Sequence, residues 1–505
     1  MYQTSMRFSR RTLLTGMAAS LACTAEPKRP NVLFVVADDL RDWTGFLGGY
    51  KGRVQTPNLD RLAARGVSFA NAHCASPVCC PSRTAILTGR MPSSSGIYNN
   101  GQWWRPHLGD VVTLPMQFRR NGYEAVGAGK IFHHTAGNNP PSQWDRFQRL
   151  EFHDDPWFRD AKINYPWSHP EPNPPGFPFA GMAGLPHEND WGSPPRAEAD
   201  LDDVRTVDFA VDYLGEPHEK PFFLACGVFR PHLPWYVPRR FFELYPLEEI
   251  ELPAAPEDDL DDVPAAGRAL SEARRDELLA IRTAGKQREA VQAYLASISF
   301  ADEQVGRVLD ALDASGEARN TIVVFWSDHG WHLGEKDHWH KSTLWRQATR
   351  VPLVIAGPAV AAGATCREAV SLVDLYPTLN ELCGFAPMAE NDGESLAALL
   401  VDPAAPREKP AVVEFDGRHA AVCDERYRYI RYGDGGEELY DHDRDPNEWT
   451  NLAADSAYAE TKRELGRWFP AQWAEPALKK GAYDFDPDTY SWTVKETGEI
   501  IRGDR

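Results

Sequence analysis

The chain has 505 residues, of which 42% are hydrophobic and 25% are charged. These values are typical of a globular protein with a sizeable core, and the length predicts a large α/β domain with a smaller one, or a single oversized domain. The formal net charge is -19 at pH 7. Because nucleic-acid-binding surfaces are basic, this charge argues against nucleic acid as a partner. An anionic substrate would have to be attracted by a local basic pocket.

Residues 1–25 have the pattern of an export signal. Arg10 and Arg11 form a twin-arginine pair, an apolar stretch continues to Leu21, and small residues lead to a cleavage region near Ala25. The alternative is a disordered N-terminus with two chance arginines. From this pattern we predict export to the periplasm.

The cysteines and the later apolar runs bear on anchoring. Cys23 lies within the signal, but Ser20 stands where a lipidation site has an aliphatic residue, so a lipid anchor is not favoured. Eight cysteines in a chain of this length are too sparse for a disulfide scaffold. After the signal no apolar run is long enough to span a bilayer, so we expect no membrane span.

In the segment 26–406, short apolar runs alternate with helical patterns. The apolar runs predict buried strands at 31–37, 124–127, 221–225, 321–326 and 351–355. Helices are predicted at 59–65, before a Gly stop, and at 287–312. This alternation predicts an α/β fold with a mostly parallel central sheet flanked by helices.

Two segments differ from this pattern. The insertion 138–198 is rich in Pro, Trp, His and Asp, and we interpret it as an ordered loop that shapes the rim of a pocket. The segment 407–505 contains an alternating strand pattern at 427–432 and a helical pattern at 458–473. It predicts a smaller C-terminal α+β subdomain.

Charged and titratable side chains follow four of the predicted strands. In open parallel α/β sheets, ligands bind outside the carboxyl ends of the strands. The residues at these positions are Asp38 and Asp39; Lys130 and His133; Arg230 and His232; and Asp328 and His329. Because four separate strands supply such groups, we predict a functional site at this edge of the sheet.

The acidic residues of this set indicate a metal. Asp38, Asp39 and Asp328 would repel one another unless a cation lay between them. Carboxylate oxygens suit Ca²⁺ or Mg²⁺, and His329 could add a nitrogen ligand, which leaves the metal's identity open. The alternative is that Asp38 and Asp39 cap a helix or line a solvated loop.

A thiol lies at the predicted start of another helix, with an arginine on the next turn. Helix N-termini lower thiol pKa values and attract anions, so Cys79 and Arg83 together favour an anion-binding, reactive position. The alternatives are a buried structural cysteine or a cysteine-dependent hydrolase. The latter would need a histidine base, for which His73 is the nearby residue.

The motif Cys79-Cys80-Pro81-Ser82-Arg83 with Thr88-Gly89-Arg90 resembles the signature of type I sulfatases, which depend on formylglycine. The resemblance continues in chain order through Asp38-Asp39-Leu40-Arg41, Gly129-Lys130-Ile131-Phe132-His133, Arg230-Pro231-His232-Leu233-Pro234, Ser327-Asp328-His329-Gly330-Trp331, Lys341 and Glu438-Leu439-Tyr440-Asp441. Within the family the chain is most similar to iduronate-2-sulfatases. The resemblance implies an alkaline-phosphatase-like sheet and covers nearly the whole chain after the signal.

Carried over by position, the resemblance implies a role for each residue of the site. Cys79 would be oxidised to formylglycine by a separate maturation enzyme. One divalent cation, expected to be Ca²⁺, would be bound by Asp38, Asp39, Asp328, His329 and the oxygen of the modified Cys79. The groups expected around the sulfate are Arg83, Lys130, His133, His232 and Lys341.

The resemblance also implies a reaction and a substrate class. A formylglycine hydrate would attack sulfur and form a sulfoenzyme, with leaving-group protonation assigned to His232 or Lys341 and the later deprotonation to His133. The expected substrate is a sulfated carbohydrate, with the 2-O-sulfate of a terminal uronic acid as first choice. The alternatives are another sulfate ester (marine polysaccharide, choline or aryl sulfate), a phosphatase or phosphonate monoester hydrolase of the same fold, and a non-catalytic, metal-dependent glycan-binding protein.

Overall fold

The computed structural model describes residues 29–148 and 189–503, together with residues 1, 176, 178–182 and 185. The predicted export signal and most of the insertion 138–198 therefore lie outside the described residues. Within the described part, no helix combines the length and the apolar composition that crossing a membrane requires.

The core of the molecule is an eight-stranded sheet. Its strands, in spatial order, are β13 (Ala364–Cys366), β2 (Gly66–Phe69), β12 (Leu353–Ala356), β9 (Thr321–Ser327), β1 (Asn31–Ala37), β7 (Phe222–Val228), β4 (Glu124–Gly129) and β5 (Arg146–Gln148). All neighbouring pairs are parallel except the two made by β12, which is antiparallel to β9 and to β2. The predicted mostly parallel sheet is thus confirmed, although β12, which overlaps the apolar run predicted at 351–355, is antiparallel to its two neighbours.

The continuous apolar sequence of β1 follows from its central position. Every residue of this strand is buried. Leu33 and Val35 pack into a hydrophobic cluster on one face of the sheet, and Phe34 and Val36 pack into a second cluster on the other face. A strand covered on both faces favours apolar side chains, and this explains the unbroken run from Val32 to Ala37. Asn31, at the start of the strand, is buried but hydrogen-bonded to Glu317 and Phe222.

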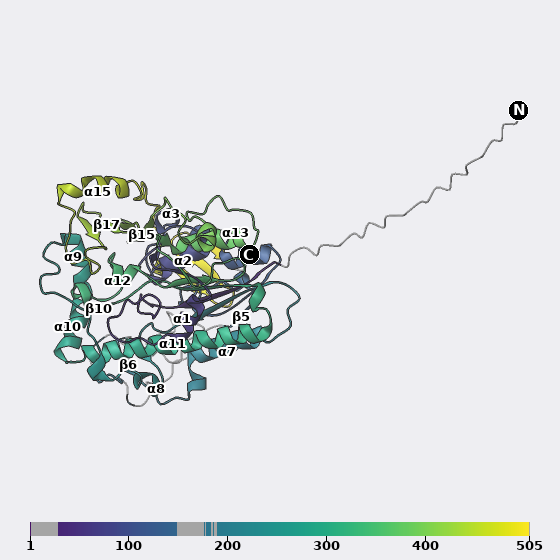
Figure 1. The fold of residues 1–505 in the computed structure, drawn as a ribbon, viewed down its shortest axis with the longest axis horizontal. Coiled ribbons are helices and arrows are strands. Elements are labelled where there is room, and N and C mark those ends of the chain that lie inside the picture. The colour runs from purple at the N-terminus through teal and green to yellow at the C-terminus, as the bar shows by residue number, and fades with distance from the viewer. Residues whose placement is uncertain (2–28, 149–175, 177, 183–184, 186–188, 504–505) are drawn as a thin grey trace.

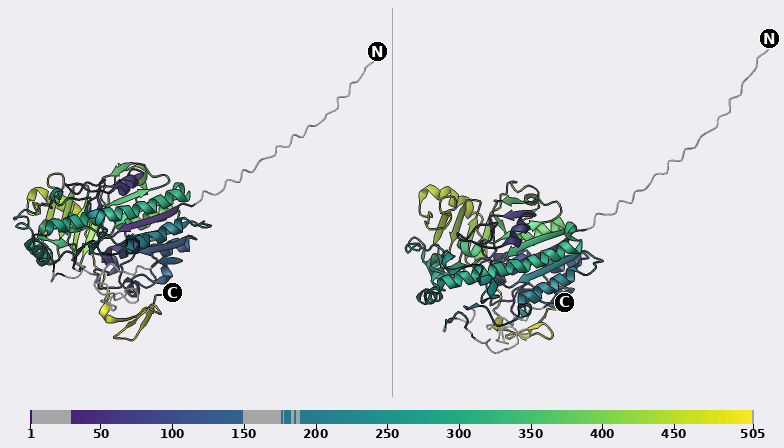
Figure 2. Two further views of the ribbon diagram at one scale, coloured as in Figure 1. Left: turned by 90° about the horizontal axis from the view of Figure 1, so that it is seen from below. Right: turned by 60° about the horizontal axis from the view of Figure 1, so that its bottom comes forward.

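Helices cover both faces of the sheet (Figures 1 and 2). The first cluster includes side chains of α1 (Pro57–Ala63), α7 (Asp202–Leu214) and α11 (Gln287–Ser315), and the second includes side chains of α2 (Cys79–Thr88), α5 (Leu114–Arg120) and α13 (Leu375–Leu382). The predicted helix at 287–312 extends to Ser315, where Gly316 ends it in a left-handed conformation with φ 80°.

Shorter elements complete the described part of the chain. Before the C-terminal part, the remaining α-helices are α3 (Pro92–Ser95), α4 (Trp104–Leu108), α8 (Arg239–Phe242), α9 (Ala265–Glu272), α10 (Arg275–Thr283), α12 (Arg346–Thr349) and α14 (Ala397–Val401). The two-stranded pairs are β3 (Ala72–His73) with β14 (Val370–Ser371), β6 (Trp191–Gly192) with β8 (Trp235–Tyr236), and β10 (His332–Leu333) with β11 (Trp339–His340).

The C-terminal part forms two small antiparallel sheets. The first contains β15 (Ala411–Phe415), β16 (His419–Cys423), β17 (Tyr427–Arg431) and β18 (Glu437–Asp441), and the second contains β19 (Tyr483–Asp486), β20 (Ser491–Val494) and β21 (Ile500–Arg502). Leu465 of α15 (Ala459–Gly466) packs against the first sheet. The helix predicted at 458–473 is therefore real but ends earlier, at Gly466.

The second small sheet packs on Trp103. This indole shares a buried cluster with Tyr483, Tyr490 and Trp492, and its own exposed fraction is 7%. The neighbouring Trp104 is only 1% exposed. Both indoles are therefore packed in the interior and do not stack on a bound sugar.

The start of the insertion 138–198 belongs to the scaffold. Residues 146–148 form β5, which pairs with β4 at the edge of the central sheet, and Trp144 is buried against Phe147 and Phe223. The interpretation of the whole insertion as a rim loop was therefore wrong for these residues. A three-residue edge strand carrying Arg and Gln has no apolar run by which the sequence could have revealed it.

Candidate active site

Four adjacent parallel strands bring the predicted site residues together. β9, β1, β7 and β4 are consecutive in the sheet, so their carboxyl ends share one edge. The residues that follow them are Asp328 and His329 after β9, Asp38 and Asp39 after β1, His232 after β7, and Lys130 after β4. The geometry thus gathers side chains that are far apart in the sequence, such as Asp39 and Asp328, which are 289 residues apart.

Close packing at the ends of β4 and β7 positions Lys130. Gly129 has a φ of 72°, and a Cβ at this position would lie 2.1 Å from the carbonyl oxygen of Gly227. The backbone N–H of Lys130 donates to this same oxygen at 3.0 Å. A glycine is therefore required here, both for the left-handed conformation and for the close approach of the two strands.

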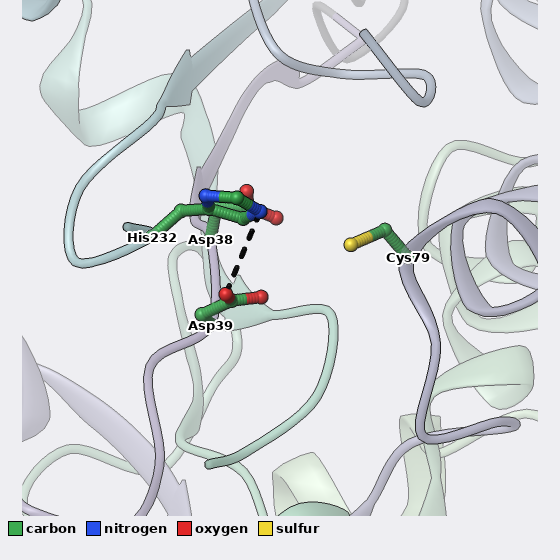
Figure 3. A group of neighbouring side chains, drawn as sticks. All are labelled: Asp38, Asp39, Cys79 and His232. Atoms are coloured by element: carbon green, nitrogen blue, oxygen red, sulfur yellow. Dashed lines mark ion pairs between the residues drawn. The ribbon is translucent and has the colours of Figure 1, made fainter. Parts of the chain in front are cut away.

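Cys79 is the first residue of α2 and faces the acidic cluster. The Sγ atom lies 3.1 Å from Lys341 Nζ, 3.2 Å from His329 Nε2 and 3.9 Å from Lys130 Nζ. Figure 3 shows the sulfur pointing toward the side chains of Asp38, Asp39 and His232. Cys79 is only 1% exposed, and burial raises the pKa of its thiol despite the two nearby ammonium groups. The unmodified thiol is therefore a protonated, enclosed group.

Three carboxylates are buried beside Cys79. Asp38, Asp39 and Asp328 each have an exposed fraction of 0%. Burial raises the pKa of Asp39 to about 7, and the charge of Asp38 acts in the same direction against the opposing effect of Lys341. Asp39 also adopts a positive φ of 61°, and its backbone N–H donates to Asp328 Oδ1 at 3.1 Å. Strained backbone of this kind is typical of functional sites.

The donor atoms of this cluster fit a divalent cation. One atom each of Asp39, Cys79, Asp328 and His329 lies within 4.8 Å of the others, and a second such group contains Asp38, Asp39, Cys79 and His232. The Nδ1 atom of His329 lies 3.1 Å from the carbonyl oxygen of Gly330, which can only accept a hydrogen bond. Nδ1 is therefore the protonated nitrogen, and Nε2 presents its lone pair to the cluster. Three carboxylates and one imidazole nitrogen form a donor set suited to a hard divalent ion.

Lys130 and Lys341 lie on either side of the acidic cluster. Lys130 Nζ donates to Asp38, and Lys341 Nζ lies 2.7 Å from Asp39 Oδ1. Burial acts to lower the pKa of Lys341, but Asp39 and the other negative groups outweigh it and hold that pKa above its usual value. The Lys341 side chain is therefore an ammonium group in the neutral pH range.

The loop that carries Lys341 is held in an unusual conformation. Four of its non-glycine residues have a positive φ: Lys336 (55°), Asp337 (49°), His340 (82°) and Ser342 (75°). His338 Nε2 lies 2.8 Å from the carbonyl oxygen of Lys341, and His340 Nε2 lies 2.7 Å from Glu277 Oε2. These two histidines, for which the sequence indicated no role, thus position Lys341. Glu277 was missed because nothing in its local sequence distinguishes it.

Arg83 contacts protein acceptors from within the site. Its Nε donates to Asp328 Oδ2 at 2.9 Å and its Nη2 donates to Asp38 Oδ1 at 2.6 Å. Nη1 donates to the carbonyl oxygens of Lys130 and Ile131. The structure therefore places Arg83 as a clamp on two of the carboxylates, whereas the sequence predicted a position against the sulfate.

Two histidines complete the predicted set. His133 and His232 are both buried, and burial lowers the pKa of each well below its usual value, so the rings are neutral at pH 7. His232 Nε2 lies 3.7 Å from Asp39 Oδ2, and the His133 ring centroid lies 4.4 Å from that of His134. The side chains of Lys341 and His232 keep exposed fractions of 12% and 11%, while the carboxylates have none. These two residues therefore mark the edge of the site that solvent reaches.

Comparisons with known proteins agree with this geometry. The family described as Sulfatase matches residues 30–385, and the one described as N-sulphoglucosamine sulphohydrolase, C-terminal, matches residues 334–472, so residues 473–505 lie beyond both. The chain is 38% identical over 461 residues to a protein named Sulfatase from Formosa agariphila, a match that covers 87% of this chain and 88% of the relative. It is 34% identical over 403 residues to iduronate 2-sulfatase from Mus musculus, a match that covers 70% of this chain and 68% of the relative.

The fold is similar to that of the phosphonate monoester hydrolase of Agrobacterium radiobacter, with a TM-score of 0.71 at 24% identity over 94% of this chain and 99% of the other. This likeness concerns the fold alone, and it confirms the predicted alkaline-phosphatase-like architecture. Taken with the family matches, which extend over most of the residues described above, it leads to one conclusion: the chain belongs to the sulfatase family of hydrolases.

Proposed function

We propose that this sulfatase acts on a sulfated carbohydrate and removes the 2-O-sulfate of a terminal uronic acid. The name of the mouse relative, iduronate 2-sulfatase, and the motifs shared with that group support this substrate class. Sulfate is an anion, and the net charge of the chain is -19. The ammonium groups of Lys130 and Lys341 supply the local positive charge that such a substrate needs.

One observation carries the proposal: residue 79 lies at the N-terminus of α2 between these two ammonium groups. A helix N-terminus favours negative charge, and Lys341 Nζ and Lys130 Nζ lie 3.1 and 3.9 Å from Cys79 Sγ. An anionic group transferred to or from this residue would therefore be stabilised from both sides. A structural cysteine would not need charged neighbours.

We further propose that Cys79 is oxidised to formylglycine and that the adjacent donors hold one calcium ion. Asp38, Asp39, Asp328 and His329 would be the protein ligands. An aldehyde at residue 79 would supply, on hydration, hydroxyls able to act as a nucleophile, and the cation would stabilise negative charge at that position.

The remaining residues then have separable tasks. Lys130 and Lys341 bind and orient the sulfate by charge, and Arg83 keeps Asp38 and Asp328 in place. His232 and Lys341 are the candidates for protonating the leaving sugar oxygen, because they lie against Asp39 at the solvent-reached edge of the site. Lys341 already carries the proton at pH 7, whereas the neutral His232 would have to gain one when the sulfate binds. His133 is proposed to accept the proton when sulfate is released.

The proposed location is the periplasm, reached through the twin-arginine signal in residues 1–25. Because that route carries folded proteins, oxidation of Cys79 should precede export. Protein recovered from its native periplasm with only unmodified Cys79 would refute this order.

Peptide mass spectrometry across Cys79 tests the chemistry, on protein co-expressed with a formylglycine-generating enzyme. We expect an aldehyde at residue 79, hydrolysis of a 2-O-sulfated uronide, and no reaction by the Cys79→Ala variant. An intact thiol, while the same enzyme modifies a control peptide, would contradict the proposal. Faster hydrolysis of a phosphonate monoester than of any sulfate ester would assign the site to the phosphonate hydrolases instead.

A further inference from the structure

Lys480 reaches the site from the far end of the chain. It precedes β19 in the segment beyond residue 472, and the yellow C-terminal strands that follow it are visible at the lower side of the molecule in Figure 2. We propose that Lys480 binds a second anionic substituent on the sugar that carries the scissile sulfate, and that it thereby selects doubly charged substrates. This inference rests on the proposed action on sulfated carbohydrate.

The backbone around Lys480 is firmly fixed to the catalytic part of the chain. Its N–H donates to the carbonyl oxygen of Gly101 at 2.7 Å, and Lys479 forms a β-bridge with Gln102. The next residue of that stretch is Trp103, which packs against the strands that follow Lys480. The side chain is thus presented by a rigid junction, as a specificity-determining group requires.

The ammonium group of Lys480 contacts a hydroxyl. Its Nζ lies 2.6 Å from Thr135 Oγ1 and 5.7 Å from the centroid of the Trp103 ring. Among the residues that the structure describes, no carboxylate forms an ion pair with this nitrogen. Three other buried or half-buried lysines behave differently, since each pairs with an aspartate: Lys130 with Asp38, Lys336 with Asp259 and Lys341 with Asp39.

Lys480 is half-buried, and a cation that is partly removed from water without a counter-ion is unfavourable. Burial lowers the pKa of Lys480 to about 8, and the Cys80 thiol offsets this only in part. Such a cost is rarely retained in a well-packed region unless a ligand relieves it, because a charge taken out of water needs a partner. An incoming carboxylate or sulfate would be that partner.

The position of Lys480 links it to the sulfate site. Thr135 lies two residues after His133, on the same loop after β4 that carries Lys130. The charge of Lys480 acts, after burial, to lower the pKa of His133, and it opposes the rise that burial causes in the pKa of Cys80, the neighbour of Cys79. The contact with Thr135 therefore places Lys480 beside the loop that carries Lys130 and His133.

This arrangement provides two separate anion positions. Lys130 and Lys341 flank residue 79, where the scissile sulfate would be bound, whereas Lys480 and the Thr135 hydroxyl form a second position. An ammonium with a neighbouring hydroxyl binds carboxylate and sulfate alike. The second substituent is therefore either a uronic acid carboxylate or another sulfate on the same ring, and the two sources can be separated by the choice of probe.

Binding measured by calorimetry in a Cys79→Ser background tests the inference without turnover. Two probe pairs are used: a 2-O-sulfated uronic acid methyl glycoside with its methyl ester, and a 2,6-di-O-sulfated hexoside with its 2-O-sulfated counterpart. We expect the doubly charged member of at least one pair to bind about 10- to 100-fold more tightly. Lys480→Gln should abolish that preference for the doubly charged member and leave binding of the singly charged member unchanged. The pair that responds identifies carboxylate or sulfate as the second group.

Lys479→Gln is the matched control, because Lys479 is the adjacent, exposed lysine. It should keep the full preference, and the melting temperatures of both variants should match that of the background protein. If Lys480→Gln retains the preference in both pairs while the sugars still bind, the inference is overturned and the proposed function stands. If no probe binds the background protein, both are overturned. A loss of affinity for doubly and singly charged members alike would also refute the inference, since it would show a structural role only.

Discussion

At the scale of single residues, Arg83 is the group that holds two of the acidic side chains of the site in place. It donates to Asp38 and Asp328, which follow two different strands, and its side chain is 1% exposed. Lysine cannot reproduce a planar fork, so Arg83→Lys should leave one carboxylate without its partner. We expect calcium affinity and kcat/KM each to fall about 10- to 100-fold, as for other residues that orient metal ligands.

Calcium titration by calorimetry and turnover of a sulfated uronide measure these two effects. Arg65→Lys is the control, because Arg65 forms a partly exposed ion pair with Asp313. Unchanged calcium affinity in Arg83→Lys would show that the guanidinium acts on the sulfate after all.

The proton donor to the leaving group can be identified by comparing substrates. A sugar oxygen needs protonation as it leaves, whereas a nitrophenolate does not. The substitution that removes the donor, His232→Asn or Lys341→Gln, should therefore slow hydrolysis of the sugar sulfate by about 10²- to 10⁴-fold more than hydrolysis of nitrophenyl sulfate. Rate measurements with both substrates decide between the two residues. Equal losses on both substrates in both variants would contradict either assignment.

The sequence allowed the reactive residues to be placed at one sheet edge, but it could not give their contacts. Asp38, Asp39, Asp328 and His329 follow strands whose apolar runs are long enough to be recognised, so their convergence followed from the strand order alone. The contacts of Arg83 with two carboxylates depend on the direction in which its side chain leaves α2, and no local sequence pattern encodes that direction. Lys480 was missed for a related reason, since its segment has no periodicity and its position arises from packing on Trp103.

At the scale of elements, a buried carboxyl group joins the first C-terminal sheet to the catalytic part. Glu414 of β15 accepts hydrogen bonds from the backbone N–H and the hydroxyl of Ser93 in α3, at 2.6 and 2.8 Å. Burial raises the pKa of Glu414 from 4.5 to about 7. The folded chain thus keeps this proton to a higher pH than the unfolded chain does. Unfolding releases it between about pH 4.5 and 7, and the contribution of Glu414 to stability falls as the pH rises through that window.

Replacing Glu414 with Gln should remove this dependence. The difference in unfolding free energy between the variant and the parent should shift in favour of the variant by on the order of 3 kcal/mol from pH 4.5 to 7, since one pKa unit corresponds to about 1.4 kcal/mol. Urea unfolding across this range measures it, with Glu408→Gln as an exposed control. A difference that stays constant with pH would show that Glu414 titrates at its ordinary value.

Elements were predictable where one physical signal dominated. The bounds of β1 were obtained correctly because burial on both faces demands an uninterrupted apolar run. α15 was predicted too long, since aromatic residues up to Trp473 continued the pattern after the helix had ended at Gly466. β5 and β13 were not predicted, as each has three residues and owes its conformation to the longer neighbour with which it pairs.

At the scale of the whole molecule, the proposed cation should contribute to stability as well as to turnover. Three buried carboxylates lie together, and the cluster joins the ends of β1 and β9 at the centre of the sheet. A ligand that binds only the folded state stabilises it by about 2.7 kcal/mol when present at one hundred times its Kd. We therefore expect chelation to lower the melting temperature and abolish turnover, and calcium to restore both.

Differential scanning calorimetry with and without chelator measures the shift in stability. The melting temperature of an Asp39→Asn variant should respond less to calcium, because this variant lacks one of the proposed ligands. An identical melting temperature of the parent protein before and after chelation would show that the cluster holds no stabilising ion.

The enclosure of Cys79 has a consequence for when the enzyme can be activated. The side chain is 1% exposed, and Lys341, which closes on it, is 262 residues further along the chain. At about 5 to 20 residues per second, a ribosome needs roughly 13 to 52 s to travel that far. Until then the thiol is open to a modifying enzyme, and afterwards the finished fold shields it.

Folded protein that still carries the Cys79 thiol should accordingly resist the maturation enzyme, while urea-unfolded protein should be modified by it. Oxidation of Cys79 would then compete with synthesis and folding of the rest of the chain, and slower translation would raise the share of active molecules.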